Sequence, residues 1–177
     1  MNKKKTATVK KVITGLKKAS KLHANQAKKL KKVFFRSKKI CNHYALNPER
    51  GAHFLGQLVH ESGTFKYTEE NLNYSTEAIL KVFGKYFESE SEAETCKRNP
   101  QALADRVYGG RMGNDGQGYL WRGRGFLQCT GKNNYSQFAA DMDLPEVMKD
   151  PDLMASDYPM ESAIWFFHRN KLWEICD

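Results

Sequence analysis

Two glutamates, Glu61 and Glu70, are the residues of this sequence whose type and spacing most clearly allow chemistry. Glu61 lies in the segment His60-Glu61-Ser62-Gly63, after an apolar stretch with helical spacing, and Glu70 follows nine residues later. Hydrolysis of a glycosidic bond needs such a pair, because one carboxylic acid protonates the leaving oxygen and one carboxylate activates water. Acidic residues are common, so the pair gains weight only from a second block about sixty residues further on.

That second block is glycine-rich and runs from Arg122 to Gly131. It does not fit a phosphate-binding P-loop, because five residues instead of four separate Gly125 from Gly131 and Asn133 stands where Ser or Thr is required. No GxGxxG pattern follows a strand either, so a dinucleotide site is unsupported. The block is better explained as a loop that passes close to a sugar chain, since glycines permit close approach of the backbone.

Neutral side chains in and after this loop have the chemistry to bind sugars. Gln128, Thr130 and Asn134 supply donors and acceptors suited to hydroxyl and N-acetyl groups. Arg122 and Arg124 have two interpretations that the sequence leaves open. They either contact the substrate or pair with acidic residues of the core.

The segment that carries Glu61 is predicted to be a helix. Asn47 can cap it, Pro48 suits its first position, and Gly63 suits its end. We expect its apolar face to be Ala52, Leu55 and Val59, with Phe54 and Leu58 beside them. Glu61 is then expected among apolar neighbours at the negative end of the helix dipole, which raises a carboxyl pKa and suits a general acid. An ordinary ion pair of Glu61 with Lys or Arg is the alternative.

The remaining elements are predicted to be mainly helical. We expect helices over residues 25–46, 76–88 after a Ser75 cap, 100–108, 134–142 and 158–171. The acidic run 88–94 is expected to be a solvated helix end or loop, and residues 109–125 are expected to be irregular. Short strands are expected only at residues 126–129 and 64–68.

The charge of the chain is concentrated near its N-terminus. Residues 1–40 hold 15 of the 29 Lys and Arg and no acidic residue, and the net charge is +9. Val9, Val12, Ile13 and Leu16 share one helical face, so residues 1–24 are interpreted as a basic amphipathic arm. A flexible basic tail is the alternative, and an arm that binds nucleic acid is a further one.

Other patterns restrict the class of protein. The length fits a single domain after the arm, and neither a secretory signal nor a run of 18 apolar residues occurs. The four cysteines form no CxxC pair, and the histidines form no HExxH pattern, so we expect reduced thiols and no metal.

Several segments together resemble family 19 glycoside hydrolases, and within that family the lysozyme-like endolysins of phages more than plant chitinases. They are His60-Glu61-Ser62-Gly63, Glu70-Asn71-Leu72-Asn73-Tyr74-Ser75, Tyr108-Gly109-Gly110-Arg111-Met112-Gly113-Asn114, Arg122-Gly123-Arg124-Gly125 with Gln128-Cys129-Thr130-Gly131, and Asn134-Tyr135. The resemblance covers about residues 40–173 and leaves residues 1–24 outside it. The domain of residues 25–177 is expected to be short at its C-terminus relative to the family.

The resemblance implies a lysozyme-like fold, mainly α, with two lobes, and inverting hydrolysis without metal or cofactor. Glu61 matches the general acid, Glu70 the general base, and Thr130 the hydroxyl residue that holds the attacking water. Gln128 and Asn134 match sugar-binding positions. Tyr74 and Arg124 are two further candidate substrate contacts.

We therefore expect a monomeric endolysin that cleaves β-1,4 bonds of peptidoglycan, made in the cytoplasm of a bacterial host and acting at the cell wall. Its basic arm is expected to meet an anionic membrane or envelope surface, and no obligate protein partner is expected. The alternatives are a chitinase that acts on GlcNAc polymers and a non-catalytic envelope- or glycan-binding protein that works through its arm.

Overall fold

The computed structural model describes residues 47–176, so the predicted arm and the predicted helix over residues 25–46 lie outside the described part of the chain. The described residues are mainly helical, as the sequence predicts. The elements, in chain order, are α2 (Pro48–Glu61), α3 (Thr76–Phe83), η1 (Gly84–Tyr86), α4 (Glu90–Thr95), α5 (Pro100–Tyr108), α6 (Lys132–Asp141), η2 (Pro145–Met148), α7 (Leu153–Ser156), α8 (Pro159–Arg169) and η3 (Leu172–Ile175).

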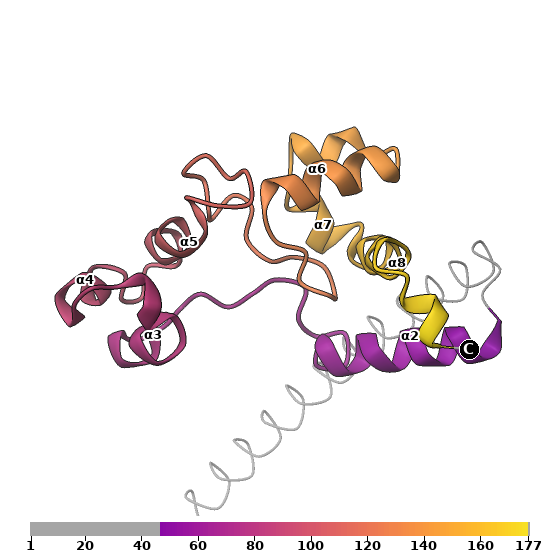
Figure 1. Ribbon diagram of the computed structural model, residues 1–177, viewed down its shortest axis with the longest axis horizontal. Helices are drawn as coiled ribbons and strands as arrows, with labels where there is room; N and C mark the ends of the chain where they lie inside the picture. Colours follow the sequence, from indigo (N-terminus) through magenta and orange to yellow (C-terminus); the bar gives the residue numbers. More distant parts are fainter. Residues whose placement is uncertain (1–46, 177) are drawn as a thin grey trace, which may run out of the picture. The chain divides into compact units, whose positions relative to one another are not determined.

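Helices α3, α4 and α5 form one lobe (Figure 1). Their apolar side chains enclose Ile79, Leu103 and Ala104, which are completely buried. Local sequence explains the starts of these helices, because Ser75, Ser89 and Asn99 each accept a hydrogen bond from a backbone N–H in the first turn. The acidic run, expected to be a solvated helix end or loop, instead forms the separate helix α4, and Glu90 and Glu92 lie in its first turn, where the helix dipole favours negative charge.

A second cluster lies among α6, α7, α8 and η2. Tyr135 and Phe138 of α6 are completely buried in it, and the Phe138 ring packs edge-on against Trp165 of α8 at 5.8 Å. The loops 62–75 and 109–131 run between this cluster and the lobe of α3 to α5 (Figure 1). These loops carry most of the residues that the sequence marks for chemistry.

Helix α2 begins at Pro48 and ends at Glu61 as predicted, but it is rotated relative to the expected face. Gly51, Phe54 and Leu58 are buried, whereas Ala52 and Val59 are exposed. The reason is the partner surface, because the Phe54 ring packs against two aromatic rings of the C-terminal region, Phe167 at 5.0 Å and Trp173 at 5.6 Å.

No strand forms among residues 47–176, which corrects the predicted strands. Two isolated β-bridges, Glu69 with Arg124 and Arg124 with Cys129, join three chain segments instead. Residues 109–125 contain no helix or strand, as expected.

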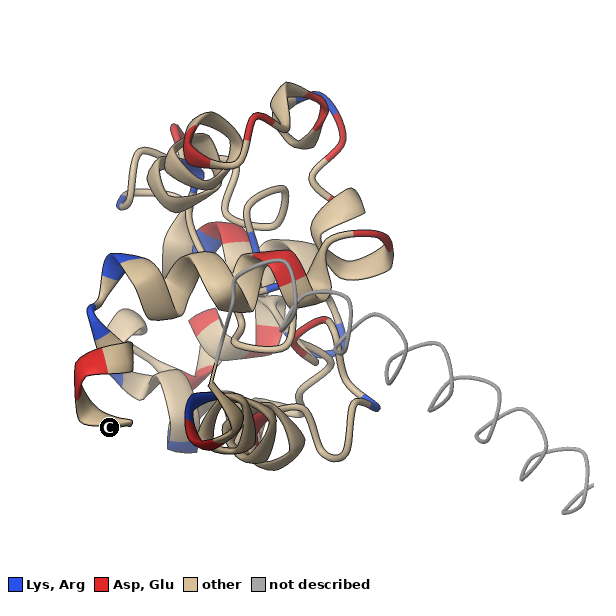
Figure 2. Cartoon of the chain, turned by 90° about the vertical axis from the view of Figure 1, so that its right-hand side faces the viewer, with Lys and Arg blue, Asp and Glu red and all other residues tan. Residues whose placement is uncertain are grey.

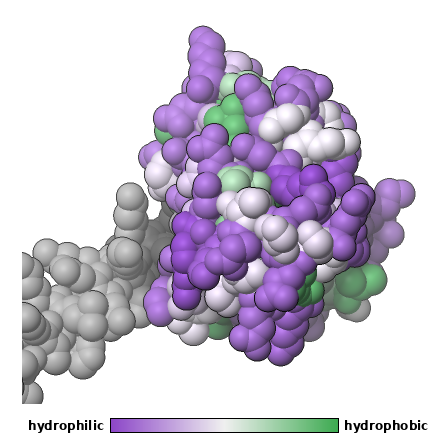
Figure 3. All heavy atoms as spheres, turned by 90° about the vertical axis from the view of Figure 1, so that its left-hand side faces the viewer, coloured by the Kyte–Doolittle hydropathy of each residue, from purple (hydrophilic) through white to green (hydrophobic). Residues whose placement is uncertain are grey.

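The surface of the described domain is polar. Acidic and basic residues are interspersed over its helices (Figure 2), and the face in Figure 3 is mostly hydrophilic with small separate apolar groups. No helix among residues 47–176 is long and apolar enough to cross a membrane.

Candidate active site

Glu70 is held by hydrogen bonds from two different segments. Its Oε1 accepts the backbone N–H of Gly123 at 2.6 Å, and its Oε2 accepts the hydroxyl of Tyr108 at 3.0 Å. The backbone N–H of Glu70 also donates to the carbonyl of Gly123 at 3.0 Å. Because each carboxylate oxygen has its own donor, the orientation of the Glu70 side chain is fixed.

Three candidate groups converge on the α-carbon of Gly123. A β-carbon at this position would lie 2.9 Å from Gln128 Oε1, 3.1 Å from Thr130 Oγ1 and 3.3 Å from Glu70 Oε1. The glycine is therefore what allows these side chains to approach one another so closely.

The amide of Gln128 leaves one acceptor open at this point. Its Nε2 donates to the carbonyl of Gly125 at 3.2 Å, which fixes the orientation of the amide. Its Oε1 is buried and has no hydrogen-bond partner among the described residues. Since buried acceptors are normally paired, this atom is suited to receive a hydrogen bond from a bound water or a sugar.

The two bridges arrange these groups. Arg124 and Cys129 exchange backbone hydrogen bonds of 3.0 and 2.8 Å, and the N–H of Gly125 donates to the carbonyl of Thr68 at 2.8 Å. Gly125 has a φ of +79°, and a β-carbon there would meet Ser162 Oγ, so this turn also requires glycine. The turn brings Gln128 and Thr130 next to the segment that carries Glu70.

Side-chain hydrogen bonds to the backbone fix the positions of Thr130 and Asn134. The Thr130 hydroxyl donates to the carbonyl of Gln128 at 2.9 Å, and the Asn134 amide donates to the carbonyl of Thr130 at 2.8 Å. Both residues are half-buried. With its proton engaged, the Thr130 hydroxyl presents its lone pairs as acceptors beside Glu70.

Glu61 is the last residue of α2, as the sequence predicts, but its side chain is exposed. The expectation that Glu61 is buried is wrong, because α2 turns Phe54 and Leu58 inward instead, although apolar side chains such as Leu127 and Phe166 line the same pocket as Glu61. Its Oε1 accepts a hydrogen bond of 2.9 Å from the amide of Gln57, one helical turn earlier.

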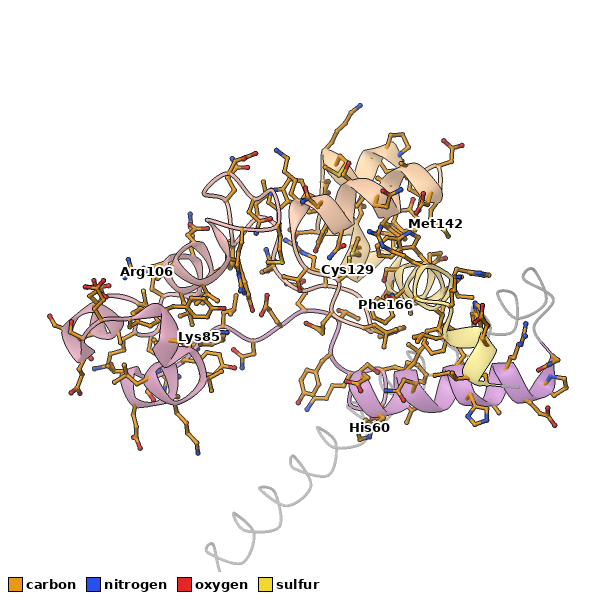
Figure 4. All side chains as sticks on the ribbon, viewed as in Figure 1. His60, Lys85, Arg106, Cys129, Met142 and Phe166 are labelled. Atoms are coloured by element: carbon orange, nitrogen blue, oxygen red, sulfur yellow. The ribbon has the colours of Figure 1, made fainter. Side chains whose placement is uncertain are left out.

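Glu61 lines a pocket of about 510 Å³ between α2 and the C-terminal region. Gln57 and His53 extend one wall along α2, and Phe166 of α8, labelled in Figure 4, belongs to the opposite wall. Gln128 lines the same pocket, and its amide oxygen also lies beside Glu70 at Gly123. Gln128 therefore belongs both to the pocket of Glu61 and to the group of side chains around Glu70.

Arg124 is placed in the core and not on a substrate surface. Its side chain is only 1% exposed, and it donates to Asp152 at 2.5 Å and to the Tyr135 hydroxyl at 2.9 Å. Arg122 pairs with Glu69 at 2.8 Å and with Asp152 at 3.2 Å. These contacts match the ion-pair alternative for both arginines, and the burial of Arg124 argues against contact with a sugar.

Tyr74 belongs to the lobe of α3 to α5. Its ring packs edge-on against Phe83 at 5.5 Å, within the cluster around Ile79. The structure thus groups Glu70, Thr130 and Gln128 closely, places Asn134 behind Thr130, and gives Tyr74 a packing role.

Sequence reasoning missed Tyr108, Gln57 and His53 as parts of the site. Gln57 lies four residues before Glu61 on one helix, so helical spacing alone could have identified it. The pKa of Tyr108 is raised by burial and then by the negative charge of Glu70. Among residues 47–176, no group of three or more His, Cys, Asp or Glu side chains is placed to hold a metal ion.

Comparison with known proteins identifies a relative of this chain. No protein-family model matches the sequence. A protein of Haemophilus influenzae named "Glycosyl hydrolase family 19 domain-containing protein" is 36% identical over 138 residues. The match covers 73% of this chain and 66% of the relative, so the chain spans just under two thirds of that protein's length. This similarity confirms the resemblance carried by the sequence motifs, and the chain belongs to glycoside hydrolase family 19.

Proposed function

We propose that this protein is a glycoside hydrolase that cleaves β-1,4 bonds of bacterial peptidoglycan by an inverting acid/base mechanism, and that it works as an endolysin. Glu61 is the general acid and Glu70 is the general base. Thr130 holds the attacking water, and Gln128 and Asn134 contact or support the substrate. The family relationship supports the reaction class, and the finer assignment rests on the arrangement of these side chains.

The proposed reaction is a single displacement by water. Glu61 donates its proton to the glycosidic oxygen while the bond from that oxygen to the anomeric carbon breaks. A water held by Thr130 attacks the opposite face of the anomeric carbon, and Glu70 takes one of its protons. The step leaves Glu61 ionised, Glu70 protonated and the anomeric configuration inverted, and exchange with solvent then reprotonates Glu61 and deprotonates Glu70.

One observation supports this assignment of roles more strongly than any other. Glu70 Oε1, Thr130 Oγ1 and the unpartnered Gln128 Oε1 meet at Gly123, where no side chain intervenes. A carboxylate and a hydroxyl oxygen side by side are the groups that orient and deprotonate a water. The pocket that contains Glu61 begins at the same Gln128, which gives the leaving group a place next to the acid.

We favour peptidoglycan over chitin as the proposed substrate because of the charge distribution of the chain. Residues 1–40 contribute 15 basic residues and no acid, and such a segment favours association with an anionic envelope. Action at the cell wall of a bacterial host and binding of the arm to an anionic surface are parts of this proposal.

The test is a turbidity assay on bacteria stripped of their outer membrane, with mass spectrometry of the soluble products. The proposal expects lysis that releases muropeptides cleaved at a glycosidic bond. Glu61→Gln should abolish this lysis. Glu77→Gln, which changes an exposed glutamate in the first turn of α3, is its matched control and should lyse normally.

Other outcomes would overturn the proposal. In a parallel incubation with chitin, release of GlcNAc oligomers without any cleavage of peptidoglycan in the bacterial assay would identify a chitinase. Lysis without any cleaved glycan would identify a protein that acts by binding alone.

A further inference from the structure

We propose that Tyr108 is a positioning residue for the reaction, and that it fixes the Glu70 carboxylate in the orientation that activates water. The inference rests on the proposed function of Glu70. It also gives a role to the segment Tyr108-Gly109-Gly110-Arg111-Met112-Gly113-Asn114, which supplies none of the catalytic groups named above.

The contact joins segments that are far apart in the sequence. Tyr108 is the last residue of α5, and its hydroxyl donates to Glu70 Oε2 at 3.0 Å. The other carboxylate oxygen is held by Gly123 N–H at 2.6 Å. With one donor alone, the carboxylate can rotate about its last bond, whereas donors at both oxygens prevent that rotation.

Asn114 connects Tyr108 to the other half of the site. Its side chain is completely buried, and its Nδ2 donates to the carbonyl of Tyr108 at 3.0 Å. Its Oδ1 accepts the backbone N–H of Lys132 at 2.7 Å, at the first turn of α6. Thr130 lies two residues before Lys132, so the buried Asn114 amide links Tyr108, which holds Glu70, to the segment of Thr130, which is proposed to hold the water.

The guanidinium of Arg111 packs against the ring of Tyr108. The guanidinium of Arg111 lies 5.5 Å from the Tyr108 ring centroid and 5.1 Å from that of Tyr86. Arg111 therefore bridges two aromatic rings of the same lobe, which restricts the direction of the Tyr108 hydroxyl.

The first experiment compares wild type with Tyr108→Phe, which keeps the ring and removes only the hydroxyl. With purified peptidoglycan we expect kcat to fall about tenfold, which corresponds to about 1.4 kcal/mol, and KM to change less than about twofold. A residue that only stabilises the fold would lower the free energy of unfolding and leave the kcat of the folded protein unchanged.

Tyr158→Phe is the matched control. The Tyr158 hydroxyl also donates to a glutamate, Glu146 Oε1 at 2.7 Å, and neither of these two residues is a candidate site residue. It should leave kcat and KM unchanged. If Tyr108→Phe behaves like Tyr158→Phe while Glu70→Gln is inactive, the inference about Tyr108 is wrong and the role of Glu70 stands.

A second experiment does not require activity. The free energies of unfolding of wild type, Tyr108→Phe, Glu70→Gln and the double variant form a cycle at neutral pH. We expect the two single changes to be non-additive, and the coupling to weaken under acidic conditions that protonate carboxylates. Additive changes at every pH would overturn the contact itself. Coupling together with a fully active Glu70→Gln would instead refute the proposed function, and with it a role of Tyr108 in the reaction.

Discussion

Gly123→Ala tests the convergence of the three candidate groups with a single methyl group. The new β-carbon would lie 2.9 Å from Gln128 Oε1, 3.1 Å from Thr130 Oγ1 and 3.3 Å from Glu70 Oε1, where an ordinary contact is 3.4 Å or more. Gln128 must therefore retreat by about 0.5 Å and Thr130 by about 0.3 Å, while Glu70 is almost unaffected.

These shifts are small for the fold and large for the chemistry. Overpacking costs about 1–3 kcal/mol, and Gly→Ala recovers about 0.4–1 kcal/mol through the unfolded chain, so we expect a loss of stability of about 1 kcal/mol. A misplacement of about 1 Å can reduce a rate about a hundredfold, so displacements of a few tenths of an ångström should reduce kcat about tenfold.

The assay measures kcat on purified peptidoglycan together with the denaturant midpoint of each variant. Gly84→Ala is the control, because a β-carbon at Gly84 meets nothing within 4 Å and its backbone is in the right-handed helical region. It should leave kcat unchanged. If folded Gly123→Ala keeps the full kcat, then Glu70, Thr130 and Gln128 do not form the reacting site.

Three further predictions address the acid, the pH dependence and the arm. Glu61→Gln keeps the shape of the side chain but cannot donate a proton, so lysis should fall about a hundredfold or more, and normal lysis by a folded variant would remove Glu61 from the mechanism. Hydrogen bonds from Trp165 and Gln137 lower the pKa of Asp141, so their stabilising contribution is present above the carboxyl's ordinary pKa of 3.8 and is lost as pH falls through the lower folded value. Asp141→Asn should therefore flatten the acidic limb of unfolding free energy against pH, and an unchanged limb would contradict this. Deletion of residues 1–24 should leave hydrolysis of short soluble oligosaccharides unchanged while lysis of whole envelopes falls, most visibly at low salt, and loss of both would place the arm in the catalytic domain.

The sequence predicts best those features that are decided locally. Ser75 and Asn99 cap the helices they precede, and Pro48 begins α2, because capping depends on residues within one turn. The position of Glu61 at the end of α2 follows from the same local rules.

Features that depend on distant partners could not be predicted in the same way. The buried face of α2 is set by Phe167 and Trp173, which lie more than a hundred residues later. Two rows of apolar residues on α2 have helical spacing, and only these partners decide which row is buried.

The same distinction holds for the site. The sequence can predict that Gln128 and Thr130 lie near each other because they belong to one loop, whereas the Tyr108 contact requires α5 to meet the segment of Glu70. The sequence left two roles open for Arg124, and its burial against Asp152 and Tyr135 depends on α6 and α7 packing around it.

The most direct measurement of the central claim is the anomeric configuration of the first product. Proton NMR during hydrolysis of a soluble peptidoglycan oligosaccharide distinguishes α from β anomers before they equilibrate. If Glu70 activates water for direct attack while Glu61 protonates the leaving oxygen, the product of β-1,4 cleavage appears first as the α anomer. Initial release of the β anomer would mean that a covalent intermediate forms, and would contradict the roles proposed for Glu61 and Glu70.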